Sequence, residues 1–320
     1  MKTKLLFILI LILCLGLCGC KQEPIEATVP TTVSTEPTEP PAPKVGLLLR
    51  NSCVDEQDSI DLQVCLESLG YQVLLRDGKN DQSKQNKQAT ALVEAGCELL
   101  VLQPVMTAGL DVLLTQITDV PVIVLDAQPE LGEDAQNVTV LCTRAENEGM
   151  VAASLPAALP KAGDLNADGT VSLVLIQGDD PEAAGIAAEF AALLNPETHI
   201  VLETVSADWN EDGGRSGCAQ LLAKHGPDIE VIVTFDEEMA MGAIAAVENG
   251  GWIPGQDFYL LTIGNSTAIR NELQIGRLSG LAAPDRAARL ETLAQLVTAL
   301  VSGQTTEKIH YIEYISVSPS

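Results

Sequence analysis

The stretch DLNADGTVS, residues 164–172, places oxygen-bearing side chains at alternating positions of a short polar segment. Asp164, Asn166 and Asp168 are followed by Gly169, which suits a tight turn. Calcium-binding loops of the EF-hand type supply oxygens at this alternating spacing. The same residues also suit an Asx-rich turn between two elements of regular structure. The segment is therefore either a cation loop or an ordinary polar turn.

The rest of the EF-hand pattern is incomplete. With Asp164 as the first ligand, Thr170 would offer its backbone carbonyl, and Ser172 a hydroxyl or a bridging water. The last ligand position, which an EF-hand fills with a Glu, falls on Leu175. The apolar run 172–176 also predicts a strand where an EF-hand has its second helix. A calcium site here needs a carboxylate from another part of the chain.

Sequence patterns that indicate catalysis do not occur. The sequence contains no HExxH, no P-loop and no GxSxG segment. The three histidines, His199, His225 and His310, fall at a strand start, at a helix end and in the terminal strand, where structural roles are expected. We predict that the protein is not an enzyme.

Residues 1–20 have the features of an export signal. Lys2 and Lys4 give a basic start, the run 5–17 is apolar but short for a membrane span, and LCGC ends at Cys20. This ending resembles the lipobox of bacterial lipoproteins, in which the last Cys is lipidated and becomes the new N-terminus. The alternative is a secretory signal whose cysteines are incidental. We expect a lipid on Cys20 to hold the protein on the extracytoplasmic face of the cell membrane.

The composition after the signal narrows the class of protein. Residues 21–44 are rich in Pro, Thr and Glu without an apolar period, which predicts an extended tether. The net charge of −26 repels nucleic acid, so no nucleic-acid partner is expected. The cysteines beyond the signal have no CxxC spacing and predict small apolar residues, unpaired or partly paired, rather than a zinc site: Cys53, Cys65, Cys97, Cys142 and Cys218.

From residue 45 onward, short apolar runs alternate with segments that have the apolar period of helices, such as 58–69, 83–95 and 183–194. Strands that are apolar at every position are covered on both faces, which indicates parallel α/β sheets flanked by helices, in two lobes. Ligands bind such sheets beyond the carboxyl ends of the strands. The predicted strands are 45–49, 71–75, 99–102, 120–125, 138–142, 172–176, 199–205, 230–235 and 258–263.

Four stretches occur in an order that resembles the type I periplasmic sugar-binding proteins, above all the galactose/glucose-binding proteins. They are NDQSKQ (80–85), DLNADG (164–169), DWN around Trp209, and EVIVTFDEEMAMGAIAAVENGG (230–251). The resemblance covers about residues 45–300. It implies two Rossmann-like lobes, joined by three crossing strands, that close over a ligand by a hinge motion.

The resemblance also implies how the chain is divided. The N-terminal lobe would comprise 45–144 plus 285–303, and the C-terminal lobe 145–284 plus 304–320. The terminal strand 308–317 would then belong to the C-terminal lobe.

The missing carboxylate of the cation loop follows from the same resemblance. In galactose/glucose-binding proteins a Glu at the start of a later strand completes a calcium loop, and Glu230 holds that place here. We expect calcium to stabilise the second lobe without taking part in chemistry. The implied metal ligands are Asp164, Asn166, Asp168, Thr170, Ser172 and Glu230.

The ligand-binding positions implied by the resemblance are only partly filled. A Trp of the second lobe is retained as Trp209, and its aromatic partner is absent. A site Arg falls at Ile186, a site Asp at Gly264 beside Asn265, and the hinge Asn at Pro284. The implied ligand-binding residues are Glu56, Gln103, Asp180, Glu182, Trp209, Asp236 and Asn265.

These positions are mostly carboxylates, and the sequence offers them no evident cationic partner other than Arg50 or Arg144. One hypothesis is therefore that the ligand bears amino groups, as an amino sugar or a polyamine does. The alternative is that the acids are solvated loop residues around an altered or abandoned site.

The sequence as a whole predicts an extracytoplasmic solute-binding lipoprotein, a monomer, that delivers a sugar or sugar-like molecule to the permease of an ABC importer. A ligand sensor for a membrane signalling receptor is the alternative, and a scaffold with a non-binding cleft is a third. The export signal excludes a transcriptional repressor of similar fold.

Overall fold

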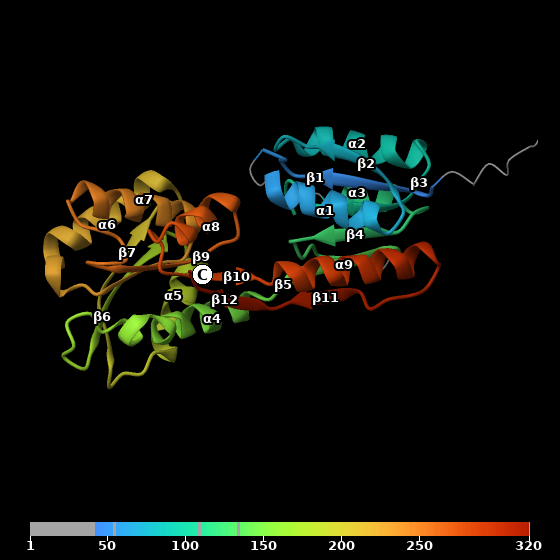
Figure 1. The fold of residues 1–320 in the computed structure, drawn as a ribbon. Coiled ribbons are helices and arrows are strands. Elements are labelled where there is room, and N and C mark those ends of the chain that lie inside the picture. The colour runs from blue at the N-terminus through green and yellow to red at the C-terminus, as the bar shows by residue number, and fades with distance from the viewer. Residues whose placement is uncertain (1–41, 54–55, 108–109, 133–134, 320) are drawn as a thin grey trace, which may run out of the picture. The chain divides into compact units, whose positions relative to one another are not determined.

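The computed structural model describes residues 42–53, 56–107, 110–132 and 135–319. The predicted lipidation at Cys20 and most of the predicted tether lie outside these residues. Within the described ranges, no helix is long and apolar enough to cross a membrane. The described chain forms two six-stranded sheets flanked by helices (Figure 1), so the predicted α/β fold class is confirmed.

The first sheet has the order β11-β5-β4-β3-β1-β2, and its pairings are parallel. Leu48 packs with helices α2 (Gln82–Glu94) and α3 (Leu110–Gln116), whereas its neighbours Leu47 and Leu49 pack with α1 (Glu56–Ser68) and α9 (Arg286–Val301). This burial on both faces explains why the strands are apolar at every position. The strands are β1 (Lys44–Leu49), β2 (Gln72–Asp77), β3 (Cys97–Leu102), β4 (Val122–Leu125), β5 (Val138–Thr143) and β11 (Ile309–Ile312).

The second sheet has the order β12-β10-β9-β8-β6-β7, in which β12 is antiparallel to β10 and the other pairings are parallel. Val174 and Ile176 pack with α6 (Glu211–His225), α7 (Glu237–Asn249) and α8 (Thr267–Gln274). Leu173 and Leu175 pack with α4 (Ala145–Ala158) and α5 (Pro181–Leu193). The strands are β6 (Val171–Gly178), β7 (His199–Ala207), β8 (Val231–Thr234), β9 (Tyr259–Ile263), β10 (Gly280–Pro284) and β12 (Tyr314–Val317).

Two short 3-10 turns complete the second lobe. They are η1 (Pro160–Gly163), directly before the predicted cation loop, and η2 (Gly226–Asp228), before β8.

Polar residues between strands and helices fix where the helices begin. A side-chain oxygen of the residue before the helix accepts a hydrogen bond from a backbone amide of the first turn, as is typical of N-caps. The capping residues with such a bond are Asp81 for α2, Asp180 for α5, Asn210 for α6, Asp236 for α7, Ser266 for α8 and Asp285 for α9.

Three segments of the chain connect the two sheets: β5 to α4, β10 to α9, and β11 to β12. These segments are bonded to one another around Glu313. The carbonyl of Glu313 accepts a 2.9 Å hydrogen bond from the amide of Asp285, and its carboxylate accepts one from the side-chain amide of Asn147.

The terminal segment corrects one sequence-based expectation. Residues 308–317 were expected to form a single strand of the C-terminal lobe, but β11 pairs with β5 of the first sheet and only β12 joins the second. The apolar residues divide accordingly, since Ile309 packs in the first sheet's core and Tyr314 in the second's. The strand is interrupted at Glu313, where the chain crosses between the lobes.

Candidate ligand-binding site

A cavity of about 350 Å³ lies at strand ends of both sheets, where ligands of parallel α/β sheets bind. From the first sheet it is lined by residues that follow or end β1, β3, β4 and β5: Arg50, Gln103, Asp126 and Thr143. From the second it is lined by residues next to β8, β9, β10 and β12: Glu237, Asn265, Pro284 and Tyr314.

A second cavity, of about 380 Å³, shares part of this wall. Arg50, Gln103 and Asp126 line both spaces. Beyond them the second cavity is bordered by the less polar segment 104–107 that follows β3. Asp126 therefore lines both the more polar cavity and the less polar one.

The polar wall of the first lobe is organised by a buried arginine. Arg289, on α9, is only 4% exposed. Its Nη1 donates to Asp58 Oδ1 and its Nη2 to Asp126 Oδ2, both at 2.6 Å. Gln103 Nε2 donates to the same two carboxylates, each at 3.0 Å. Two side chains with different donor groups thus hold one pair of carboxylates.

The loop that carries Gln103 is fixed by the NDQSKQ segment. Gln85 is fully buried, and its Nε2 donates to the carbonyls of Leu49 at 3.2 Å and of Gln103 at 2.8 Å. Its Oε1 accepts from the amide of Val105 at 3.1 Å. This segment therefore positions the loops after β1 and β3 rather than reaching the cavity itself.

Two lining residues next to the crossing segments are paired. The hydroxyl of Tyr314, in β12, donates to Glu148 of α4. Burial and the neighbouring carboxylate raise the pKa of Tyr314 well above its ordinary value. The phenol therefore stays protonated at any physiological pH and remains a donor.

In the second lobe, Trp209 and Asp180 form a bonded pair. The indole Nε1 of Trp209 donates to Asp180 Oδ2 at 2.7 Å, while Asp180 Oδ1 caps α5 through the amide of Ala183 at 2.9 Å. The ring lies against Gly178, where a Cβ would come within 1.9 Å of Trp209 Cε2. Trp209 has a φ of 51°, in the left-handed region that most residues avoid. The pair is locally held, and Trp209 remains 36% exposed.

The carboxylates that follow β8 accept hydrogen bonds from backbone amides. Asp236 Oδ1 accepts from the amides of Glu238 at 2.8 Å and Met239 at 3.1 Å. Burial raises the pKa of Asp236, against the effect of these hydrogen bonds. Glu237 Oε2 accepts from the amides of Asn265 and Ser266, both at 2.9 Å. Both carboxylates thus shape the loops around the cavity.

The structure brings together only part of the predicted ligand set. Gln103 and Asn265 line the cavity described above. Among the described residues, Glu56, Asp180, Trp209 and Asp236 lie outside its lining, and nothing is described of the side chain of Glu182. Arg144 does not line this cavity, and its guanidinium lies 4.2 Å from the centroid of the Tyr311 ring.

Sequence reasoning missed Asp58, Asp126 and Arg289. Asp126 directly follows the buried strand β4, so its place at a strand's carboxyl end was a usable signal. Asp58 and Arg289 lie inside helices, 231 residues apart in the sequence, and their polar contact left no local pattern.

Glu230 does meet the DLNADG loop. It is 2% exposed, its Oε1 accepts from the amides of Leu165 at 2.7 Å and Asn166 at 3.1 Å, and its Oε2 from that of Ser172 at 2.8 Å. The predicted contact between loop and later strand is therefore present.

The other oxygens of the loop also accept hydrogen bonds. Asp164 accepts from the amides of Asp168 and Gly169, and Asp168 from the amide and hydroxyl of Thr170. The bonds from Thr170 lower the pKa of Asp168. Across the described chain, no group of three or more His, Cys, Asp or Glu side chains is arranged around a common metal position. The donor types suit calcium. In the structure the same oxygens accept hydrogen bonds from backbone amides of the loop.

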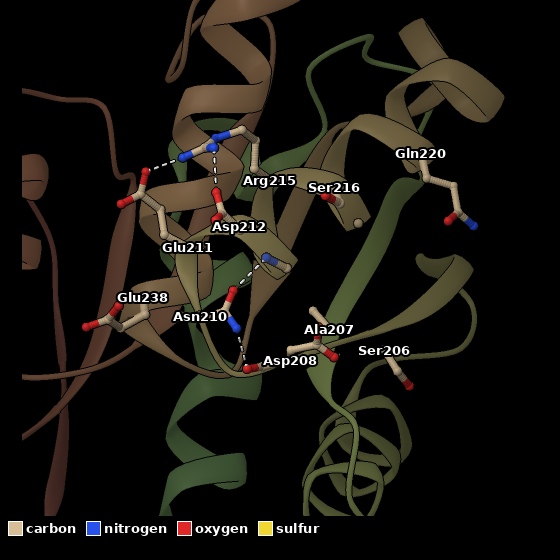
Figure 2. A pocket seen from close by; sticks show the side chains of 12 residues that line it. Ser206, Ala207, Asp208, Asn210, Glu211, Asp212, Arg215, Ser216, Gln220 and Glu238 are labelled. Carbon is tan, nitrogen blue, oxygen red and sulfur yellow. Dashed lines mark hydrogen bonds and ion pairs between the residues drawn. The ribbon is translucent and has the colours of Figure 1, made fainter.

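A different hollow, of about 650 Å³, lies along the first turns of α6 (Figure 2). Arg215 bonds to Glu211 and Asp212 on the same helix, and Asn210 caps that helix through Gly213. These polar groups are satisfied locally on one helix, which is the ordinary arrangement of a solvated surface. This hollow also borders the carboxyl end of β7 but is lined by the second lobe alone, so the cavity lined by strand ends of both sheets is the better candidate for ligand binding.

Comparison with known proteins gives the following matches. A family model described as a periplasmic binding protein domain matches residues 59–305. The D-galactose/methyl-galactoside binding periplasmic protein of Haemophilus influenzae is 27% identical over 253 residues, 74% of each chain. The ribose import binding protein of Bacillus subtilis is 25% identical over 187 residues, and the chain spans 57% of its length.

Solved structures share the fold at lower identity. The periplasmic component of an arabinose ABC transporter from Shewanella sp. ANA-3 superposes with a TM-score of 0.66 at 16% identity, covering 86% of this chain and 91% of that one. A chain of the TorS sensor domain–TorT complex superposes with a TM-score of 0.68 at 14% identity, covering 87% and 92%.

Proposed function

This chain belongs to the family of periplasmic binding proteins, and we propose that it captures a small sugar or sugar-like ligand in the cavity at the strand ends of its two sheets. The observation that carries the proposal is the Asp126–Arg289–Asp58 arrangement with Gln103. It presents hydrogen-bonding groups already held in place, as a site for a polyhydroxylated ligand requires.

The acidic lining does not call for a positively charged ligand. Asp58 and Asp126 share the guanidinium of Arg289, and Glu237 is held by backbone amides. A carboxylate that accepts such bonds can still accept a hydroxyl from a neutral sugar. We therefore favour a neutral ligand, and amino sugars and polyamines serve as the competing arm of the test.

Delivery to an ABC importer is the role we propose for the bound form. It is supported by the similarity to a ribose import binding protein and to the binding component of an arabinose ABC transporter. The likeness to a chain of the TorS sensor domain–TorT complex supports a second candidate, in which a membrane sensor reads the ligand-bound form. Deleting the permease genes separates the two, because it abolishes uptake but not signalling.

We propose that a lipid on Cys20 anchors the protein to the extracytoplasmic face of the membrane, through the tether 21–44. Expression with radiolabelled palmitate tests this. The wild-type protein should carry label and sediment with membranes, and Cys20→Ser should do neither. Label retained by Cys20→Ser would contradict the anchor.

We also propose that the DLNADG loop holds a structural calcium ion. Asp164, Asn166, Asp168, Ser172 and Glu230 would supply side-chain oxygens and Thr170 its carbonyl. The ion would add stability that grows with its concentration relative to Kd, and it would take no part in ligand chemistry. Its rival is a metal-free turn closed by Glu230.

The ligand proposal is tested by a thermal-shift panel on the mature chain. The panel contains D-ribose, D-galactose, L-arabinose, myo-inositol and D-allose, with glucosamine and spermidine as the amine arm. We expect one or more neutral compounds to raise Tm in a concentration-dependent way. A shift in Tm with the amines alone would overturn the neutral-ligand proposal. No shift in Tm with any compound would favour the alternative hypothesis, a scaffold protein whose cleft does not bind a ligand.

A further inference from the structure

Arg289 is far less exposed to solvent than the arginine of an ordinary surface ion pair. It is 4% exposed, and Asp58 is 6% exposed. Asp126, by contrast, has a side chain 45% exposed and lines both cavities. Burying an arginine is costly unless carboxylates and good geometry offset the loss of water. The arrangement therefore connects a buried charge to a carboxylate on the cavity wall.

The two oxygens of Asp126 are used differently. Both Arg289 Nη2 and Gln103 Nε2 donate to Oδ2, at 2.6 and 3.0 Å. Within the described chain, Oδ1 is left without a protein donor. Asp126 also has a φ of 58°, the left-handed conformation that turns the backbone sharply at the end of β4. One oxygen is thus fixed by the protein while the other remains for a ligand.

We propose that Arg289 is a positioning residue that sets ligand specificity: it locks Asp126 so that only Oδ1 is offered to the ligand. This inference rests on the proposed binding of a sugar-like ligand in the cavity. A ligand that donates a hydroxyl hydrogen at this point is accepted. A ligand with a carbonyl or a carboxylate there is rejected, because an ionised carboxylate has no hydrogen to donate.

A purely structural role for Arg289 makes a different prediction. If the ion pair only holds α9 against α1, replacing it by neutral groups lowers stability but leaves ligand affinity intact. Replacing both members together avoids the unpaired buried charge that a single substitution would leave. The informative variant is therefore Asp58→Asn/Arg289→Met, in which Arg286 can still bond Asp61, 3.0 Å away in the wild-type chain.

The second lobe provides a matched control. Arg277 bonds Glu272, which is 7% exposed, and Glu248, and none of the three lines the cavity. The double variant Glu272→Gln/Arg277→Met removes an ion pair whose carboxylate is buried like Asp58, although the Arg277 side chain is 36% exposed. It should lower Tm, as loss of such pairs does, and leave the dissociation constant within about twofold of wild type.

The experiment measures, by calorimetry on the mature full chain, the affinity for the neutral sugar of the panel that gives the largest thermal shift. We expect Asp58→Asn/Arg289→Met to bind at least about tenfold more weakly, the loss typical of one misplaced charged hydrogen bond. Arg289→Lys keeps the charge but cannot span both carboxylates, so it should recover only part of the affinity.

The outcomes separate the two claims. Wild-type affinity in both Asp58→Asn/Arg289→Met and Arg289→Lys would overturn the positioning role and leave the proposed function standing. Failure of the wild-type chain to bind any sugar would overturn both. If the double variant does not fold, Arg289→Lys carries the test, and a dissociation constant within about twofold of wild type would contradict the inference.

Discussion

Glu230 and Leu165 lie 65 residues apart in the sequence, and the Oε1 of Glu230 accepts a 2.7 Å hydrogen bond from the amide of Leu165. With the bonds from Asn166 and Ser172, this carboxylate joins the start of β8 to the loop before β6. Removing it leaves backbone amides without their acceptor. We predict that Glu230→Ala lowers the free energy of unfolding by about 2 to 4 kcal/mol.

Urea unfolding of the EDTA-treated protein checks this value, because EDTA removes any contribution of a bound metal to stability. Glu230→Gln keeps one acceptor oxygen and should lose less. Equal stability of Glu230→Ala and wild type in EDTA would contradict the closing role of this side chain.

Calcium should raise the stability of the wild-type chain further. At a concentration about 100-fold above Kd, a metal that binds only the folded form adds about 2.7 kcal/mol. We predict a higher Tm in calcium chloride than in EDTA, with magnesium giving less, because it tolerates only a tighter octahedral site. Asp164→Asn should abolish the response to calcium, and in EDTA it should melt slightly below wild type because it keeps only one of the two acceptor oxygens for the amides of Asp168 and Gly169. An unchanged Tm in calcium would leave the loop as a metal-free turn.

The buried thiol of Cys218 should limit stability at alkaline pH. Burial raises the pKa of Cys218 from 9.0 to about 12. The unfolded chain ionises this thiol above pH 9 while the folded chain keeps it protonated, so its contribution is full below pH 9 and is lost as the pH rises towards 12. Cys218→Ala should flatten the fall in stability between pH 8.5 and about 10.5.

Thiol labelling offers an independent check of the same feature. The exposed Cys53 should react rapidly with a thiol reagent at pH 8, and Cys218 only after unfolding. Rapid modification of Cys218 in the native protein would contradict its burial.

The contact of Trp209 with Gly178 can be broken selectively. A Cβ at Gly178 would fall 1.9 Å from Trp209 Cε2, so Gly178→Ala should displace the ring and break its bond to Asp180. We predict a stability loss of about 1 kcal/mol and a red shift in tryptophan emission. Trp252, packed edge-on against Phe258 at 5.2 Å, should be unaffected. An unchanged spectrum in Gly178→Ala would count against this packing.

Much of the fold could be predicted because burial on both faces leaves a plain signal. The nine apolar runs correspond to strands, as at 99–102 for β3, and the family resemblance is confirmed by the match over residues 59–305. The strand β10 and the division of 308–317 were not predicted. The antiparallel partner β12 and the crossing at Glu313 depend on contacts between distant parts of the chain.

The site was less predictable than the fold. Gln103 and Asn265 follow strands, so the strand-to-helix order located them. Trp209 and Asp180 were expected to hold ligand through the family pattern, yet they bond to each other outside the described cavity lining. The hydrogen bonds of Arg289 to Asp58 and Asp126 join two helices and a loop. Neither the spacing of residues in the sequence nor their secondary-structure propensity indicates such a contact.

The central claim is that Asp126 anchors a small neutral ligand in the cavity. The most direct measurement is calorimetric titration of the mature chain and of Asp126→Ala with the sugars of the panel, with Asp257→Ala as a remote carboxylate control. We predict saturable one-to-one binding of a neutral sugar by wild type and by the control, and a loss of at least about 100-fold in Asp126→Ala. Equal affinity in Asp126→Ala, or binding of amines only, would contradict the account.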